Sequence, residues 1–114
     1  MKFISFLHDK KAKFGIINNQ IITDLTGKIS GTNTLKDLIA EKGISEAKKY
    51  ASNNPGNISL DQIEYLPLIP NPGKIICVGL NYSEHVKETN RTIEENPVIF
   101  HRFPESQTAH LQPI

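Results

Sequence analysis

Cysteine, tryptophan and long apolar runs are scarce in this 114-residue sequence, which has one Cys, no Trp and 7% aromatic residues. With Cys77 alone, neither an internal disulfide nor a zinc centre built on several cysteines can form, and this favours a reducing setting. The longest apolar run, residues 75–80, is far shorter than the ~20 residues that span a bilayer. We therefore expect a soluble cytoplasmic protein without a signal peptide.

The sequence also lacks an excess of either charge, since 13 Lys and Arg residues against 12 Asp and Glu residues leave a net charge of +1. Proteins dedicated to nucleic acids or to anionic membrane surfaces carry clustered positive charge. We therefore expect neither a nucleic-acid partner nor a membrane partner. The chain length allows one compact domain at most, and the hydrophobic fraction of 38% indicates a modest core.

Apolar segments alternate with polar turns along the first 25 residues. The apolar segments cover residues 3–7, 12–17 and 21–25. Asn18-Asn19, between the last two, is suited to a tight hairpin because asparagine tolerates a positive φ. The pattern predicts an antiparallel β meander, whose exposed edges another element must cover.

The pattern then changes to helical spacing. Three apolar residues share one helical face, and a threonine before them is a candidate N-cap (Leu35, Leu38 and Ile39; Thr32 or Thr34). We expect a helix over residues 34–41 that ends by Gly43, and one or two further helical turns over 44–51. Residues 52–60 are expected to form a loop.

Prolines divide the chain between residues 66 and 73, where Pro67, Pro70 and Pro72 discourage regular structure. The sequence thus indicates a β-rich subdomain over 1–64 and a second part over 65–114. In the second part we expect a buried strand at 74–78, a turn at Gly79, a helix at 83–88 and a strand at 98–103. The expected fold class is α+β.

His85 and Glu88 are the residues that best suit catalysis. Three positions apart on a helix, they share one face, so that the carboxylate can orient the imidazole and raise its basicity. Such a pair can deprotonate water, because the pKa of histidine lies close to neutrality. The same spacing also occurs in ordinary surface ion pairs, so the pair alone leaves both interpretations open.

The surrounding residues resemble a known family. The stretch PGKIICVGLNYSEH at residues 72–85, then Glu88, PVIF at 97–100 and Arg102-Phe103, are similar to the opening of the catalytic domain of the fumarylacetoacetate hydrolase family. The resemblance covers about residues 65–114 and is most specific from Gly79 to Glu88. Residues 1–64 match only the general style of the variable N-terminal region that precedes this block in many relatives.

The resemblance implies a metal-dependent hydrolase that cleaves a carbon–carbon bond in a β-diketo or 2-oxo acid. It assigns His85 as the base that activates water and Glu88 as its orienting partner. Arg102 stands where many relatives have lysine, and its guanidinium could hold a substrate carboxylate. Leu80 replaces an arginine found in some decarboxylating relatives, which favours hydrolysis. A decarboxylase or hydratase of the same family is the enzymatic alternative.

In the family, acidic residues that follow this block hold the metal. We therefore expect magnesium or manganese in the complete enzyme, no metal on this chain, and no activity from this chain alone. The resemblance also implies a homodimer when the enzyme is complete. A different class of function stays open, namely a non-catalytic interaction or dimerisation module built on the N-terminal β meander.

Overall fold

The computed structural model describes residues 1–79 and 96–113. The chain divides into two compact units, the first formed by Met1–Asn71 with Gln107–Ile114 and the second by Pro72–Ser106. No helix in the described part of the chain has the length and apolar character that a membrane crossing requires.

The first unit begins with the expected antiparallel meander of β1 (Lys2–His8), β2 (Lys11–Asn18) and β3 (Ile21–Asp24). Both hairpins turn through two residues of positive φ, Asp9-Lys10 (51° and 60°) and Asn19-Gln20 (49° and 68°). The second turn thus lies one residue later than the sequence suggests, because Asn18 is still paired with Ile21 in the ladder. These two-residue turns fix the register of all three strands.

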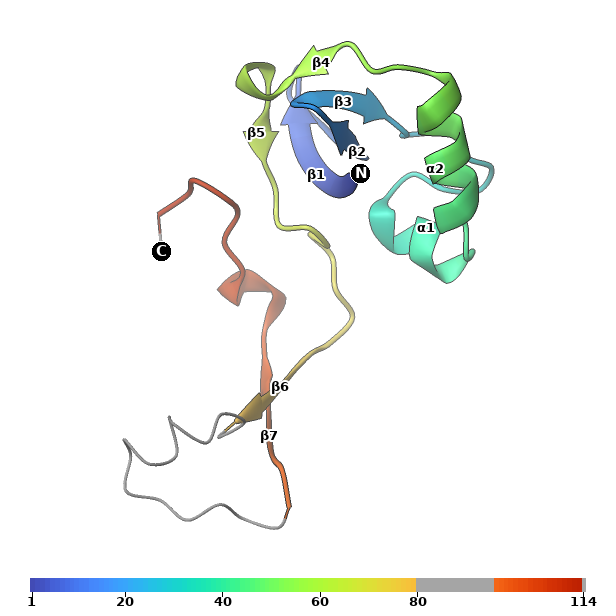
Figure 1. Ribbon diagram of the computed structural model, residues 1–114. Coiled ribbons are helices and arrows are strands. Elements are labelled where there is room, and N and C mark those ends of the chain that lie inside the picture. The colour runs from blue at the N-terminus through green and yellow to red at the C-terminus, as the bar shows by residue number, and fades with distance from the viewer. Residues whose placement is uncertain (80–95, 114) are drawn as a thin grey trace. The chain divides into compact units, whose positions relative to one another are not determined.

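Two very short strands extend this sheet at its edges. β4 (Ile58–Ser59) pairs with β3, β5 (Glu64–Tyr65) pairs with β1, and the strand order is β4-β3-β2-β1-β5. The 3₁₀ turn η1 (Leu60–Gln62) joins these two edges directly, so the five-stranded sheet curls on itself (Figure 1). The expectation of a loop over 52–60 is therefore wrong at both ends: residues 52–53 are helical, and pairing with β3 makes residues 58–59 a strand.

Both faces of the curled sheet are apolar, and each packs into its own core. The strand register puts one buried cluster on the inner face of the curl, formed by Ile4, Phe6, Ile22 and Ile58. The helices α1 (Leu35–Ala40) and α2 (Ile44–Asn53) supply the other cluster together with the strands (Figure 1). Its buried members are Phe14, Ile16, Leu25, Ile29, Leu35, Leu38 and Ala47.

The helix predicted at 34–41 is confirmed as α1, and Thr34 is its N-cap. Thr34 Oγ1 accepts from the Asp37 amide at 3.2 Å, and Asp37 Oδ2 accepts from the Thr34 amide at 2.9 Å, which forms a capping box. Hydrogen bonds from Thr34 and Asn33 hold the pKa of Asp37 below its usual range. The Gly43 amide donates to the Leu38 carbonyl oxygen at 2.9 Å, so α1 ends by Gly43 as predicted, and Gly43 is also the N-cap of α2. α2 runs for 10 residues, longer than the expected one or two turns.

The second unit contains an antiparallel hairpin of β6 (Ile75–Gly79) and β7 (Val98–Arg102), followed by the 3₁₀ turn η2 (Pro104–Ser106). Both predicted strands are present, but Gly79, expected in a turn, is the last residue of β6 because it pairs with Val98. The helix expected at 83–88 lies outside the described residues. The expectation that 74–78 is buried is wrong, since Ile76 and Val78 are 65% and 50% exposed. Their β-branched side chains favour a strand, but no described residue of this unit covers them.

Leu38→Ala should lower the free energy of unfolding by about 2–5 kcal/mol, because it leaves a cavity at a side chain that is 0% exposed. Ile39→Ala is the matched control, since the neighbouring side chain is 54% exposed and its loss should change stability by less than about 0.5 kcal/mol. Urea denaturation of both variants measures the difference. Equal losses would contradict the placement of α1 against the sheet.

A charged pair closes one end of the inner face. Lys13 Nζ donates to Asp24 Oδ2 at 2.8 Å, and the Thr26 amide donates to Asp24 Oδ1 at 2.8 Å. Burial would raise the pKa of Asp24, but the hydrogen bonds from Lys13 and Thr26 and the charge of Lys13 hold it below its usual range. The carboxylate therefore stabilises the fold at neutral pH, and this contribution is lost as the pH falls through the lowered pKa.

Asp24→Asn should cost about 1 kcal/mol at neutral pH, because the pair is part-buried rather than fully exposed. The difference from wild type should shrink between about pH 5 and pH 2, as the wild-type carboxylate is protonated. Thermal unfolding of both proteins across this range measures it. A difference that stays constant down to the lowest pH would show that Asp24 is not stabilised as an anion.

Candidate functional site

Of the three residues that the sequence assigns to the site, the structure describes Arg102. His85 and Glu88 lie outside the described residues, so their mutual placement stays a prediction. Arg102 is the last residue of β7 and is paired in register with Ile75 at the start of β6. The candidate site is therefore the end of the hairpin that carries Arg102.

Arg102 is tied to the turn that follows it. Its Nη2 donates to the Ser106 carbonyl oxygen at 2.9 Å, while the Ser106 amide and hydroxyl both bond to the Phe103 carbonyl, at 3.0 and 2.7 Å. Ser106 thus has a structural role in η2. A guanidinium carries five N–H donors in a fixed plane, so one bond to the turn fixes its position and leaves donors for a ligand.

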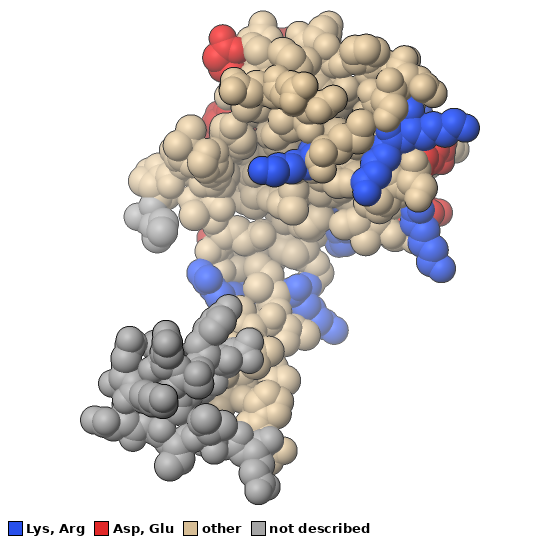
Figure 2. Space-filling model, in the orientation of Figure 1, with Lys and Arg blue, Asp and Glu red and all other residues tan. Residues whose placement is uncertain are grey.

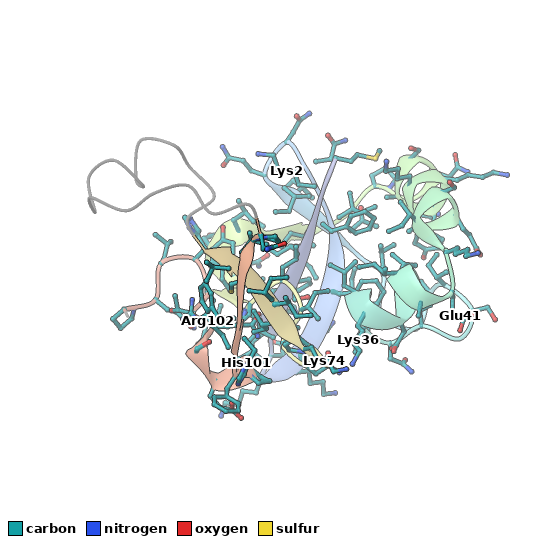
Figure 3. All side chains as sticks on the ribbon, turned by 90° about the horizontal axis from the view of Figure 1, so that it is seen from below. Lys2, Lys36, Glu41, Lys74, His101 and Arg102 are labelled. Carbon is teal, nitrogen blue, oxygen red and sulfur yellow. The ribbon has the colours of Figure 1, made fainter. Side chains whose placement is uncertain are left out.

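Arg102 lines a cavity of about 490 Å³ within the second unit. The cavity lies where the start of β6 meets the end of β7, and its walls are largely apolar, with Ile75 and Phe100 among them. Lys74 and His101 also line it, and the His101 ring packs edge-on against Phe103 with centroids 5.7 Å apart. Figure 3 labels Lys74, His101 and Arg102 on this hairpin.

This arrangement combines positive charge with apolar surface. Two cationic residues, Lys74 and Arg102, and one imidazole, His101, line this largely apolar cavity, which suits a small molecule with a carboxylate at one end and a carbon chain at the other. Arg102 was found through the family motif, whereas Lys74 and His101 were missed. The antiparallel pairing of the two predicted strands would have brought all three to one end of the hairpin.

The described residues offer no metal centre, since no group of three or more His, Cys, Asp or Glu side chains comes together among them. Cys77, in the middle of β6, is half-buried and paired in register with Phe100. His110 packs edge-on against Tyr65, with ring centroids 4.9 Å apart, in the first unit. The described part of this chain therefore gives no ligand set to which a divalent cation could be assigned.

Known proteins similar to this chain point to one family, although no protein-family model matches it. A mitochondrial oxaloacetate tautomerase of Xenopus laevis is 36% identical over 76 residues, which cover 67% of this chain and 24% of that protein. A fumarylacetoacetate hydrolase domain-containing protein 2 homologue of Dictyostelium discoideum is 53% identical over 32 residues, 28% of this chain and 10% of that protein. The resemblance to the fumarylacetoacetate hydrolase family is confirmed.

A solved structure supports the same conclusion for the fold. An HpcE-like protein of Mycobacterium smegmatis matches 90% of this chain and 36% of its own chain, with a TM-score of 0.64 and 20% identity. The α+β fold class, with its antiparallel sheet and two helices, is therefore confirmed. The chain spans about a quarter of the Xenopus relative, so the fumarylacetoacetate hydrolase resemblance concerns part of such a protein. Because that relative is named as mitochondrial, a cytoplasmic location stays a prediction.

Arg102→Gln should loosen η2, because it weakens the bond to the Ser106 carbonyl. We expect amide hydrogen exchange at Ser106 to accelerate by roughly two- to tenfold, the effect of one net hydrogen bond. Lys74→Gln removes the same charge from the same cavity without touching that bond, and should leave Ser106 unchanged. NMR-detected exchange measures both variants, and equal rates at Ser106 would contradict the anchoring role of Arg102.

Proposed function

We propose that this chain is part of an enzyme that acts on a 2-oxo or β-diketo acid through an enolate. The observation that carries the proposal is the 36% identity to a protein named as an oxaloacetate tautomerase, because oxaloacetate is itself a 2-oxo acid. The cavity at Arg102 supports it, since its cationic and apolar lining suits such a substrate. An interaction module is less well supported, because this relative is named as an enzyme.

Arg102 would bind the substrate carboxylate. Its position is held by the bond to the Ser106 carbonyl, and Lys74 adds a second positive charge to the same cavity. The remaining N–H donors of Arg102 could take the carboxylate in a bidentate grip. Ile75 and Phe100 would contact the carbon chain of the substrate. This arrangement would orient the reacting carbonyl without taking part in proton transfer, because arginine stays protonated.

His85 would act as the general base in hydrolysis, with Glu88 orienting its ring. His85 takes a proton from water, and the hydroxide attacks the carbonyl carbon farther from the carboxylate. The carbon–carbon bond then breaks, and its electron pair leaves as the enolate of a 2-oxo acid, which takes up a proton on carbon. One water is consumed, and two acids are formed.

Tautomerisation is the second candidate, and the name of the Xenopus relative favours it. Here His85 would remove a proton from the carbon beside the ketone, and the resulting enolate would take up a proton on oxygen. No water is consumed and no carbon–carbon bond breaks. Both candidates pass through an enolate, so the same base and the same carboxylate grip serve either reaction.

We propose magnesium or manganese for the complete enzyme, where its charge would stabilise the enolate oxygen. The described residues contain no cluster of three or more potential ligands, so no ligand for it is assigned to them. We also propose that the complete enzyme is a homodimer, as the family resemblance implies.

In the full-length enzyme, His85→Ala should lower kcat by about 10²–10⁴-fold, the usual cost of losing a general base. Glu88→Gln should reduce kcat less and shift the pH profile, because the imidazole remains but loses its orienting carboxylate. Glu41→Gln, an exposed carboxylate of the first unit, is the matched control and should leave kcat unchanged.

The assay should offer both substrates, a β-diketo acid and oxaloacetate, with added magnesium. Release of two acids from the β-diketo acid would identify hydrolysis, whereas keto–enol exchange of oxaloacetate without cleavage would identify tautomerisation. Turnover of both substrates by the His85→Ala variant at the wild-type rate would contradict the proposed base. Circular dichroism of each variant checks that it remains folded.

A further inference from the structure

A second cavity, of about 370 Å³, lies within the first unit beside the end of β3. β4 pairs with β3 only at Ile21 and Ile22, so the next two residues, Thr23 and Asp24, extend past the end of β4. The chain between α2 and β4 borders the opening that results, and its residues 54–57 line the cavity together with Ile58 of β4. This cavity shares no lining residue with the one at Arg102.

The border of this cavity is fixed by contacts to β3. Thr23 Oγ1 donates to the Asn54 carbonyl oxygen at 3.3 Å. Gly56 lies so close to the backbone of Ile22 that a Cβ at this position would collide with the Ile22 carbonyl oxygen. The side-chain amide of Asn54, the C-cap of α2, donates to the Tyr50 carbonyl oxygen at 2.9 Å. The cavity is therefore preformed rather than dependent on a free loop.

The lining of the cavity carries more positive than negative charge. Lys13 and Lys28 line it together with Asp24, and the Lys13–Asp24 pair cancels one charge of each sign. Lys28 is exposed and makes no side-chain ion pair or hydrogen bond to any described residue. One ammonium group is thus left for a ligand, and this composition favours an anion over a cation.

His8 adds an unsatisfied polar atom. Its Nδ1 is buried and has no hydrogen-bond partner among the described residues, and the nearby Asp9 carboxylate oxygen is 3.4 Å away on a side chain that is 85% exposed. Leaving a buried polar atom without a partner is unfavourable. Because Nδ1 itself is enclosed, a ligand would contact the accessible part of the ring, which lines the same cavity as Lys28 and leaves the side chain 21% exposed.

We propose that this cavity binds a small anion through a carboxylate or phosphate group, which Lys28 and His8 contact directly. The cavity volume lies at the small end of the range of about 300–1,000 Å³ typical of small-molecule sites, so the ligand is a compact one. Tyr50 and Asn57 also line the cavity and would bind further polar groups of the ligand through their hydroxyl and amide. This site does not depend on the catalytic proposal above.

NMR titration of the 114-residue chain with sodium succinate and, separately, with inorganic phosphate tests the proposal, with sodium chloride at equal ionic strength as the reference. We expect saturable shifts at the amides of Thr23, Asp24 and Asn57 with at least one of the two anions. Saturation by succinate alone would identify a carboxylate ligand, and saturation by phosphate alone would identify a phosphate ligand. Shifts that match those in chloride would overturn the site.

Lys28→Gln should weaken the binding by about tenfold, the effect of losing one charge-assisted contact. Lys48→Gln removes the same charge from an exposed lysine of α2 that does not line this cavity, and should leave the affinity unchanged. Equal weakening by both variants would show general electrostatic attraction rather than a site, and so would contradict the proposal. His8→Gln should also weaken binding, and an unchanged affinity in this variant would contradict the proposed direct contact between His8 and the anion.

Discussion

The curl of the five-stranded sheet is the constraint on which the first unit depends. Its two edges, β4 and β5, follow one another in sequence, so the single turn η1 must carry the chain from one edge to the other. Ser59 and Gln62 form a capping box in this turn, with the Ser59 amide donating to Gln62 Oε1 at 2.9 Å. Two edges of two residues each leave little backbone open to pairing with another chain.

The edge at β5 is reinforced by polar contacts from segments far away in sequence. Buried Ser5 donates through Oγ to the Leu68 carbonyl at 2.8 Å, which holds the chain that leaves β5 against β1. Gln112 donates to Glu64 Oε1 at 3.1 Å and to the Tyr65 carbonyl at 3.3 Å. The last described residues therefore cover this edge.

Figure 2 shows that Lys and Arg side chains do not merge into one basic surface on the visible face, in keeping with the balanced charge.

Local sequence signals predict the elements that depend on local energetics. Alternating apolar residues predict the meander, and Thr34 with Leu35 and Leu38 predicts α1. β4 and β5 could not be predicted, because each has two residues and forms only where the curl brings it beside another strand. The position of the second turn was off by one residue, since the ladder extends to Asn18 and asparagine tolerates either conformation.

The site shows the same division. Arg102 could be predicted because it belongs to a sequence motif. Lys74 and His101 could not, because they come near Arg102 only through the antiparallel pairing of β6 and β7. Apolar composition predicts burial for β6, but exposure depends on what packs against a strand, and composition does not report this. The two cavities differ in the same way. The cavity at Arg102 includes a residue of a recognisable motif, whereas the cavity beside β3 forms where strand pairing ends, which no motif predicts.

The central claim is that the hairpin end at Arg102 binds the carboxylate of a 2-oxo acid. Titration of the 114-residue chain with pyruvate, followed by NMR, tests it most directly, because pyruvate is the smallest acid that carries a ketone beside its carboxylate. The account predicts saturable shifts at Ile75, His101 and Arg102 that are lost in Arg102→Gln. Shifts that are absent there, or that persist unchanged in Arg102→Gln, would contradict it.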